Sequence, residues 1–405
     1  MGTAAAAEAP TKAPLFNRNY VLMIFVNICL SIAFYFFQPI LPVYIVDQGI
    51  SVAIAGIITG LFSLTALVAR PFTGLLADRI SPKIVLMIAL PLEAVFGAGY
   101  GLLPSVPWLT TCRIIHAVGF SLASTVALVY GSFFVPRERM GEGIGYLGLG
   151  AVLGTAVGPT MGLTIADKLS FRATFLIGGV IFMIGFILLL MTRPPKEISE
   201  KKPEKKGIRF SDMLDVKLFP LSFMAGLLAL ANGFCTSFIA LHAASRGIEH
   251  VGLYFTIMAI CLVVSRPLAG KLVDKKGLSI VAIPCFILTI LGLLVISRAH
   301  SFAYIALAGV LGAGQGTGMT AIQTACVRSV PDEKRGVAGS TYFVFSDVFQ
   351  GAGPMVGGRF AELTSPSPAA ITYVPLYTLG SCILTFGLVL YIIYAGIRKK
   401  RGTPL

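Results

Sequence analysis

The sequence predicts an all-α membrane protein in which twelve transmembrane helices form two pseudo-symmetric six-helix bundles. Three observations predict this fold class. First, 56% of the 405 residues are hydrophobic and only 12% are charged, whereas soluble proteins have about 25% charged residues. Second, the apolar residues gather in twelve segments of about 20 residues, the length that a bilayer requires. Third, the pattern of the first six segments recurs in the last six.

A long polar stretch divides the apolar segments into two groups of six. It reads RPPKEISEKKPEKKGIRFSD at 193–212, and its lysines predict a basic cytoplasmic linker at 193–216. We therefore expect an N-terminal bundle at 19–192 and a C-terminal bundle at 217–397. The expected helices lie near 19–46, 52–76, 84–103, 107–134, 143–166, 172–192, 217–245, 249–273, 278–298, 301–329, 336–362 and 371–397.

Positive charge orients these helices in the membrane. The net charge is +14, and with a cytoplasmic N-terminus most of the 32 Lys and Arg residues fall in cytoplasmic stretches. Four of the others fall in outer loops, and Arg70, Arg113, Arg266 and Arg359 lie within helices or at their ends. This distribution satisfies the positive-inside rule. We expect a plasma or inner membrane protein with a disordered cytoplasmic N-terminus at 1–18, a cytoplasmic tail at 398–405 and no nucleic-acid partner.

Several function classes lack their motifs in this sequence. The seven cysteines show no metal-binding spacing, and no zinc, haem or Walker-type phosphate motif is present. We expect no metal and no cofactor, so transport would be driven by a gradient rather than by bound ATP. An enzyme is not expected, because the four histidines are scattered. A channel is not expected either, because two similar halves suggest alternating access.

Two copies of one charged phrase show that the halves are an internal repeat. ARPFTGLLADRISPK at 69–83 is echoed by SRPLAGKLVDKKGLS at 265–279. Further matches extend from Gly56 to Gly162 of the first half at a nearly constant offset. Such a repeat predicts two rigid bodies, related by an axis along the membrane normal, that rock about a site near the midplane.

The repeated phrase resembles a loop motif of the major facilitator superfamily, and the closest resemblance is to its twelve-helix drug:proton antiporters. The motif G-x-x-x-D-R-x-G-R-R/K is matched except that Ser81 and Pro82 stand where Gly and Arg are usual. A carboxylate there can sit against a helix N-terminus and bias one conformation; a solvated loop is the alternative. We expect Asp78 and Arg79 to gate, and Asp274 to preserve the scaffold. The expected gating set is Arg70, Gly74, Asp78, Arg79, Lys83, Gly270 and Asp274.

A second phrase, GYLGLGAVLGTAVGPTMG, resembles the antiporter signature in the family's fifth helix. The matching residues are Gly145, Gly154, Gly158, Pro159 and Gly162. Small residues at this spacing let two helices approach closely, and the proline bends the helix. The resemblance implies an exporter, whereas generic helix packing is the alternative.

A third phrase, RIIHAVGFS, resembles the family motif R-x-x-Q-G-x-G in the fourth helix. Arg113 matches, and His116 replaces Gln. The resemblance implies proton coupling by Arg113, and His116 adds a titratable group one turn away. A guanidinium inside a bilayer is costly and is therefore functional by default, although a structural Arg paired with a carboxylate is the alternative.

Carboxylates within the predicted helices are few. Asp347 lies near the middle of the eleventh helix, and we expect it to be the main proton or substrate carboxylate. Glu93 lies midway along the third helix, either as a partner of Arg113 or as a protonated structural acid. The first helix lacks the acid that many drug antiporters carry there, which weakens the analogy with exporters of cationic drugs.

Uncharged polar side chains mark the expected substrate cavity. Four of them share one face of the first helix, within about 80° of arc. In the family's fold, helices 1, 4, 7 and 10 line the cavity, so we expect the polar residues on these helices to contact substrate. The alternative for each residue is a hydrogen bond between helices. The 28 phenylalanines are spread through every helix, so we expect no aromatic box. The expected substrate-binding residues are Asn27, Ser31, Tyr35, Gln38, Asn232, Thr236, Gln315, Met319, Gln323 and Gln350.

These features together predict a monomeric secondary active transporter that uses protons and a small-molecule substrate. The expected function is proton-coupled antiport that exports amphipathic small molecules, as in multidrug efflux. The alternative is a dedicated proton-coupled exporter of a natural metabolite such as a sugar or metallophore, which the polar stripe and the missing first-helix acid favour. An importer is disfavoured by the fifth-helix signature.

Overall fold

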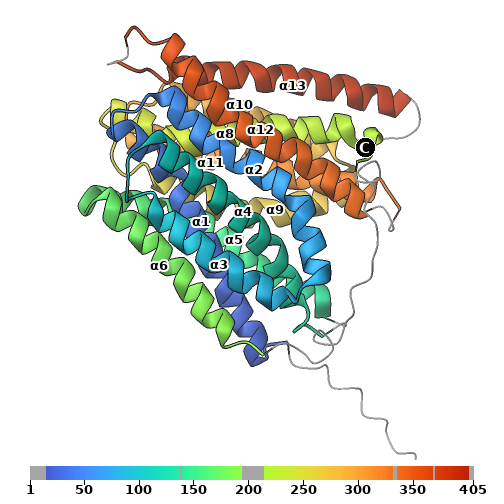
Figure 1. Ribbon diagram of the computed structural model, residues 1–405. Coiled ribbons are helices and arrows are strands. Elements are labelled where there is room, and N and C mark those ends of the chain that lie inside the picture. Colours follow the sequence, from blue (N-terminus) through green and yellow to red (C-terminus); the bar gives the residue numbers. More distant parts are fainter. Residues whose placement is uncertain (1–14, 137–138, 194–213, 332–334, 368–369, 401–405) are drawn as a thin grey trace, which may run out of the picture.

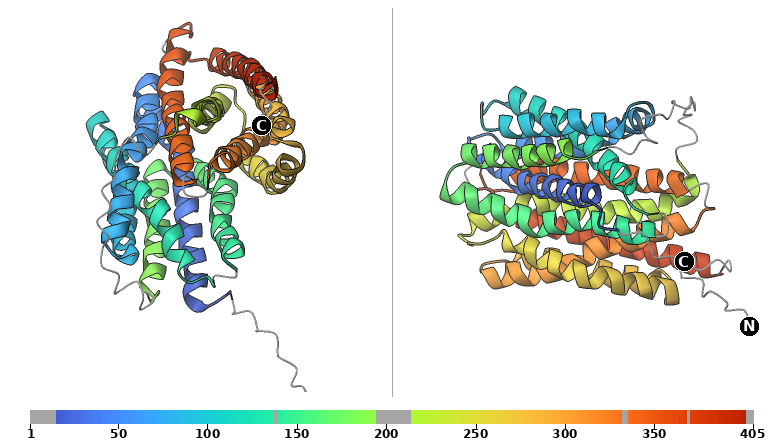
Figure 2. Two further views of the ribbon diagram at one scale, coloured as in Figure 1. Left: turned by 90° about the vertical axis from the view of Figure 1, so that its right-hand side faces the viewer. Right: turned by 90° about the horizontal axis from the view of Figure 1, so that it is seen from below.

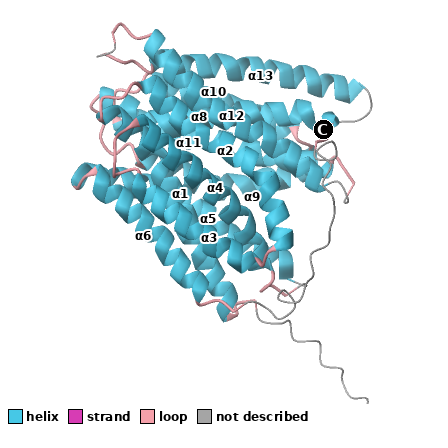
Figure 3. Cartoon of the chain, in the orientation of Figure 1, coloured by secondary structure: helices cyan, strands magenta, loops and turns pink. Residues whose placement is uncertain are grey.

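The structure is a computed structural model, and it describes residues 15–136, 139–193, 214–331, 335–367 and 370–400. For some residues inside the helices it describes the backbone and not the side chain; the predicted site residues among these are Gly74, Asp78, Arg79, Gly145 and Asp274. The described chain is helical and contains no strand (Figure 3). The predicted all-α fold is therefore confirmed.

Twelve α-helices follow one another in the described part of the chain. The N-terminal bundle contains α1 (Arg18–Asp47), α2 (Val52–Arg79), α3 (Pro82–Gly99), α4 (Val106–Ser132), α5 (Met140–Lys168) and α6 (Phe171–Leu190). A 3-10 helix, η3 (Val216–Leu218), precedes the C-terminal bundle. That bundle contains α8 (Phe219–Ser245), α9 (Leu253–Lys276), α10 (Ser279–Ser297), α11 (Phe302–Arg328), α12 (Arg335–Leu363) and α13 (Val374–Lys400).

Eleven of these helices are long and apolar enough to cross a membrane. The exception is α12, whose 29 residues are sufficient in length. Its mean hydropathy is lowered by glycines, serines and the charged residues Asp347, Arg359 and Glu362. A helix this polar is tolerated only where other helices cover it, so α12 belongs at the interface between the bundles.

The end of α3 and the start of α9 differ most from the predicted bounds, and the end of α3 has a local cause. The expected segment ran to residue 103, but the helix ends at Gly99, and turns follow it. Pro104 disfavours a helical conformation of the residue before it, so the helix stops earlier than the apolar pattern does. Trp108 Nε1 donates a hydrogen bond to the Gly99 carbonyl at 2.7 Å and satisfies one of the exposed acceptors of this helix end.

Each bundle has its own hydrophobic core. One cluster of buried residues extends from Leu15 to Leu189, and the other from Leu218 to Tyr391. The two bundles are visible as separate groups of helices in Figures 1 and 2. Val52, the first residue of α2, joins the C-terminal core, so this end of α2 is packed against the other bundle.

Where the chain is described, the bundles are in close contact at one end only. We call the end where α6 finishes and η3 begins the linker end, and the opposite end the far end. In the far half, a Cβ on Gly351 of α12 would lie 2.8 Å from the carbonyl oxygen of Gly60 on α2, so only glycine permits this approach. Thr160 of α5 donates a hydrogen bond to the Gly252 carbonyl, before α9, at 2.7 Å.

The linker end is open by comparison. Val68 and Phe72 on α2 are 66% and 63% exposed. A Cβ on Gly270, near the linker end of α9, would have no described atom within 4 Å. In Figure 1 the two bundles diverge toward this end. The structure is therefore closed at the far end and open at the linker end.

Candidate functional site

A cavity of about 210 Å³ lies between the two bundles. Its walls come from α1, α2, α4 and α5 on one side and from α8, α9 and α12 on the other. The predicted site residues that line it are Tyr35, Gln38, Arg70, Pro159, Asn232, Thr236, Asp347 and Gln350. A ligand here would contact both bundles, as alternating access requires.

An ion pair joins the bundles in the wall of this cavity. Arg70 Nε of α2 donates a hydrogen bond to Asp347 Oδ2 of α12 at 2.8 Å. The two side chains are 30% and 16% exposed, and the guanidinium also lies 5.0 Å from the ring centroid of Phe343. The sequence predicts a gating role for Arg70 and a proton or substrate role for Asp347, and the structure brings the two side chains together. Charge at this depth is expensive unless it is paired, so the pair stabilises the contact between α2 and α12.

The polar face of α1 is divided between the cavity and a helix contact. Tyr35 and Gln38 line the cavity. Asn27 and Ser31 do not, because α5 covers the linker half of α1: a Cβ on Gly154 would lie 2.8 Å from Ser31 Cβ. The Asn27 side chain instead donates a hydrogen bond to the Met23 carbonyl at 3.1 Å.

Glycines of α5 produce this close contact with α1. A Cβ on Gly158 would lie 3.0 Å from Tyr35 Cβ, and one on Gly162 would lie 3.0 Å from the Phe36 carbonyl oxygen. Small residues at this spacing therefore act as a packing surface. Gly145 of the same phrase lies outside the residues whose side chains are described.

The C-terminal bundle contributes a pair of amides to the cavity. Asn232 Nδ2 of α8 donates a hydrogen bond to Gln350 Oε1 of α12 at 3.1 Å. Thr236 donates to the Asn232 carbonyl at 2.8 Å, and its side chain also lines the cavity. Each amide retains further donor and acceptor capacity, so the pair can hydrogen-bond a ligand.

The predicted residues of α11 are not placed at the cavity. Gln315 is buried within the C-terminal bundle, and Met319 packs against its core. The Tyr342 hydroxyl of α12 donates a hydrogen bond to the Met319 carbonyl at 3.2 Å. Gln323 is half-buried and does not line the cavity. Gln315 thus faces the interior of its own bundle, and none of the three predicted residues lines the cavity.

Aromatic side chains form the part of the wall that the sequence did not single out. Phe34 of α1 and Phe120 of α4 stack with ring centroids 4.1 Å apart, and Phe62 of α2 lies 5.4 Å from Phe34. Phe255 and Met258 of α9 line the opposite side. No local pattern marks these positions, because the cluster assembles from separate helices. The cavity therefore offers aromatic surface beside polar and charged groups.

A buried polar cluster lies behind this aromatic wall in the N-terminal bundle. The Arg113 guanidinium lies 4.4 Å from the ring centroid of Phe62 and donates a hydrogen bond to the Thr59 carbonyl at 3.2 Å. The His116 ring contacts Phe62 edge-on at 5.4 Å. His116 Nδ1 and the Tyr100 hydroxyl are hydrogen-bonded at 3.0 Å. One phenylalanine ring thus separates the cavity from both predicted coupling residues.

Several buried polar atoms of the N-terminal bundle have no hydrogen-bond partner among the described residues. They are both carboxyl oxygens of Glu93, Nε of Arg113 and Nε2 of His116. Of the two alternatives for Glu93, the ion pair with Arg113 is not formed in this structure, and a protonated structural acid stays a prediction. Unsatisfied buried polar groups are costly and call for an explanation. One explanation is that these side chains accept or release a proton.

The remaining gating residues lie near the linker end. Lys83 Nζ donates hydrogen bonds to the carbonyls of Thr192 at 2.6 Å and Leu190 at 3.3 Å, and it thereby caps the end of α6 within its own bundle. Gly270 makes no close contact with a described atom. Gly74, Asp78, Arg79 and Asp274 lie outside the residues whose side chains are described.

Comparison with known proteins identifies a family for this architecture. The family model described as Major Facilitator Superfamily matches residues 23–354 and 221–404. An uncharacterized MFS-type transporter, YhhS of Escherichia coli (strain K12), is 29% identical over 330 residues, which cover 78% of this chain and 80% of the relative. The multidrug resistance protein MdtG of Citrobacter koseri is 25% identical and covers 87% of this chain and 91% of the relative.

Solved structures share the fold at low sequence identity. The nucleoside transporter NupG has a TM-score of 0.72 and 13% identity, covering 93% of this chain and 99% of that one. A bacterial homologue of the human lysosomal transporter Spinster, in an inward-facing and unoccupied conformation, has a TM-score of 0.66 and 17% identity. The match covers 94% of both chains. At such identities the likeness concerns the fold alone.

Proposed function

The chain belongs to the major facilitator superfamily, and from this premise we propose that it is a proton-coupled antiporter that exports amphipathic small molecules. As a multi-pass membrane transporter it needs a substrate site that both bundles share. The observation that carries the proposal is the Arg70–Asp347 ion pair in the wall of the cavity between the bundles.

The ion pair offers a direct link between a proton and the contact of the two bundles. When Asp347 takes up a proton, it loses the charge that holds Arg70, and the pair across α2 and α12 weakens. A ligand can shift a conformational equilibrium only by interacting differently with its two states. A proton bound at Asp347 meets this condition, because the partner of that carboxylate belongs to the other bundle.

A second proton site is proposed for the buried cluster behind Phe62. His116 and Glu93 are both titratable. Among the described residues, His116 Nε2 and the two carboxyl oxygens of Glu93 have no hydrogen-bond partner. Arg113 contacts the same phenylalanine ring as His116 and adds positive charge beside this histidine. Movement of that ring would connect the cluster to the cavity, so we assign these residues to proton coupling.

The substrate class follows from the composition of the cavity wall. Phe34, Phe62 and Phe120 supply aromatic surface, and Asn232 and Gln350 supply hydrogen-bonding amides. This mixture suits an amphipathic molecule. The direction of transport is supported by the fifth-helix glycine motif and by the similarity to a multidrug resistance protein.

A dedicated exporter of a natural metabolite, such as a sugar or metallophore, is the second candidate. The Asn232–Gln350 pair favours it, because a directed amide pair suits a ligand rich in hydroxyl groups. Among the described residues that line the cavity, the one carboxylate is Asp347. It already has a cationic partner, which disfavours a cationic substrate.

We further propose the orientation and the gate. The positive-inside rule assigns the linker end and both termini to the cytoplasm of a plasma or inner membrane. Asp78 and Arg79, in the loop motif at that end, would form the cytoplasmic gate when the bundles close there. The transporter would act as a monomer, because one chain supplies both bundles.

Proteoliposomes with an imposed pH gradient test the function. Neutral, cationic and anionic fluorescent amphipathic dyes serve as probes, together with a sugar mixture for the second candidate. We expect probe movement against its gradient to follow the pH gradient in the wild type. Probe flux that does not depend on the pH gradient would contradict proton-coupled antiport.

The Asp347→Asn variant tests the residue assignment. We expect it to lose transport driven by the pH gradient but to retain exchange of labelled for unlabelled probe, since exchange needs no net proton movement. Glu249→Gln, which neutralises an 88% exposed carboxylate outside the cavity, is the control and should remain coupled. Unchanged coupling in Asp347→Asn would remove this carboxylate from the mechanism.

A further inference from the structure

A carboxylate of the C-terminal bundle caps a helix of the N-terminal bundle at the far end. Glu362, in the last turn of α12, accepts at Oε1 a hydrogen bond from the backbone N–H of Ala53 at 2.8 Å. Ala53 is the second residue of α2, and the first N–H groups of a helix have no acceptor within that helix. Glu362 therefore satisfies a donor that α2 leaves open.

This contact adds to the cap that α2 has from its own chain. Ser51, the residue before α2, accepts at Oγ a hydrogen bond from the Ile54 N–H at 3.3 Å. Glu362 accepts from a different N–H of the same turn, where a negative charge is favourable because the N-terminus of a helix carries partial positive charge. The start of α2 is thus capped once from its own bundle and once, by a charged group, from the other bundle.

The cap forms where the backbones of the two helices touch. A Cβ on Gly358, one turn before Glu362, would lie 3.2 Å from Ala53 Cα, and α2 and α12 lie side by side in Figure 1. The Glu362 side chain is 20% exposed, and its other oxygen, Oε2, lies 3.6 Å from Nη1 of Arg359 on the same helix. Because donor and acceptor belong to different bundles, the bond between Ala53 and Glu362 breaks when the bundles separate at this end.

The internal repeat does not require a carboxylate with this contact. Gly162 and Gly357 are equivalent positions of the two halves, so Asp167 and Glu362, each five residues further on, are equivalent as well. The Asp167 side chain is exposed and makes no hydrogen bond or ion pair with a described residue. In the equivalent contact, between α5 and the start of α9, the Thr160 hydroxyl donates to a backbone carbonyl instead. The cap by Glu362 is therefore particular to α2 and α12.

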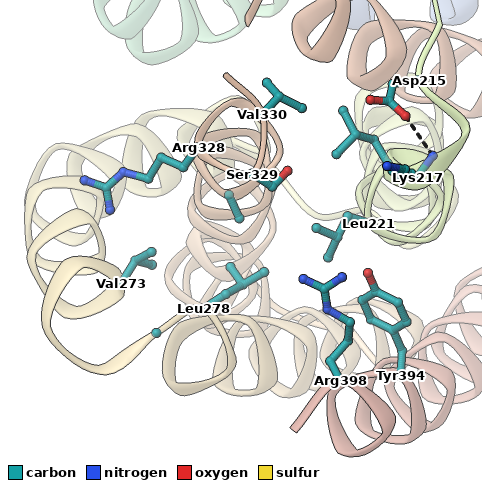
Figure 4. A pocket seen from close by; sticks show the side chains of 13 residues that line it. Asp215, Lys217, Leu221, Val273, Leu278, Arg328, Ser329, Val330, Tyr394 and Arg398 are labelled. Atoms are coloured by element: carbon teal, nitrogen blue, oxygen red, sulfur yellow. Dashed lines mark hydrogen bonds between the residues drawn. The ribbon is translucent and has the colours of Figure 1, made fainter. Parts of the chain in front are cut away.

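Glu362 also lies apart from the two largest cavities of the described chain. It does not line the cavity between the bundles. A second cavity, of about 370 Å³, lies at the linker end of the C-terminal bundle, where Figure 4 shows Leu221, Leu278 and Arg398 in its wall. Glu362 does not line this cavity either. Its carboxylate therefore acts at the contact between the bundles rather than on a ligand held in either cavity.

We propose that Glu362 holds the far end closed and thereby favours the conformation that is open at the linker end. A contact shifts a conformational equilibrium only when it differs between the two states, and the cap by Glu362 exists only while the far end is closed. Loss of a helix cap changes an equilibrium about fivefold, so the population that is open at the far end should rise about fivefold without it. The proposal rests on alternating access, as the proposed function does, but it is independent of substrate, coupling ion and direction of transport.

Hydrogen exchange of the full-length protein in detergent, read by mass spectrometry, provides the test. We expect Glu362→Ala to accelerate exchange about fivefold at the far ends of α5 and α9, which form the other contact between the bundles, and to slow exchange at the linker ends of α2 and α9. Acceleration confined to the first turn of α2 would indicate a local cap without a gating role and would overturn the proposal. Unchanged exchange, or acceleration at both ends of the bundles, would overturn it as well, because neither result is an opening of the far end.

Two variants at related positions are the controls. Asp167→Ala removes the equivalent carboxylate, which is exposed, and Arg359→Gln removes the cation beside Glu362, whose side chain is mostly exposed. Both should exchange as the wild type does. A change in Asp167→Ala equal to that in Glu362→Ala would rule out the cap as the cause.

A conservative variant separates the hydrogen bond from the side chain as a whole. Glu362→Gln keeps an acceptor oxygen and loses only the charge, so its exchange should change in the same direction as that of Glu362→Ala and by less. A larger change than in Glu362→Ala would contradict the role of the hydrogen bond, and the unfolding temperature of each variant reports folding independently. No substrate or pH gradient enters this experiment, so its failure would leave proton-coupled antiport standing, and a failure of antiport in proteoliposomes would leave the role of Glu362 standing.

Discussion

Neutralising one partner of the Arg70–Asp347 pair should destabilise the protein more than neutralising both. The interacting atoms are 2.8 Å apart, and the side chains are 30% and 16% exposed. At an effective dielectric constant of about 20, unit charges about 4 Å apart attract each other by about 4 kcal/mol. Removing one partner of a fully buried pair costs about 3–5 kcal/mol, because the other charge is left without compensation.

The partial exposure of Arg70 reduces this penalty through solvent screening. We therefore expect Arg70→Gln and Asp347→Asn each to lower the free energy of unfolding by about 2 kcal/mol. The double variant leaves no unpaired charge and should lose only about 1 kcal/mol. The coupling energy between the two positions is then about 3 kcal/mol, at the upper end of the range for residues in contact.

Thermal unfolding of the purified variants in detergent measures the order of stability. The double variant should unfold at a higher temperature than either single variant. Arg359 and Glu362, also on α12, provide the control: their charged atoms are 3.6 Å apart, and Arg359 is 64% exposed. Exposed helical pairs contribute about 0.3–0.5 kcal/mol, so their cycle should be nearly additive. A double Arg70/Asp347 variant less stable than both single variants would refute the proposed ion-pair energetics.

Three further predictions concern the bundle contact, the aromatic wall and the amide pair. Gly60→Leu places a side chain against α12, which costs about 1–3 kcal/mol in a packed contact, so hydrogen exchange at the far ends of α2 and α12 should accelerate about tenfold. The control is Gly339→Leu, at a position without described neighbours within 4 Å, and it should leave the exchange rate unchanged. Phe62→Leu keeps an apolar side chain but loses the contact with the Arg113 guanidinium, and the unfolding temperature should fall by the equivalent of about 1 kcal/mol. An unchanged unfolding temperature would mean that this contact contributes nothing to stability. Asn232→Ala should raise the KM for the transported probe about fivefold, as expected for one lost hydrogen bond of about 1 kcal/mol. Gln315→Ala should not alter the KM. A larger increase in KM for Gln315→Ala than for Asn232→Ala would place the substrate site at α11.

Much of the fold could be predicted from the sequence because the relevant signals are local. Each membrane span must satisfy its own backbone hydrogen bonds and present about 20 apolar residues to lipid, so hydropathy and spacing locate most of the helices. The end of α3 at Gly99 shows the limit of that reasoning, since the apolar pattern continued beyond the residues that form helix. The internal repeat supplied the division into two bundles.

The candidate site was predicted only in part, because it depends on contacts between distant residues. Arg70 and Asp347 are separated by 277 positions. Each residue attracts attention alone as a charge inside a membrane helix. Their pairing depends on how α2 and α12 are rotated about their axes and on which end of the bundles is closed.

The sequence by itself determined which faces of the helices are polar, and only the tertiary structure decided what covers each face. Tyr35 and Ser31 share one side of α1, yet the first borders the cavity and the second lies under a glycine of α5. Gln315 is as polar as Gln350, but its helix turns it into the core of its own bundle. Periodicity defines a direction around a helix axis, whereas a binding site also requires an open space in that direction, and that space depends on the packing of all the neighbouring helices.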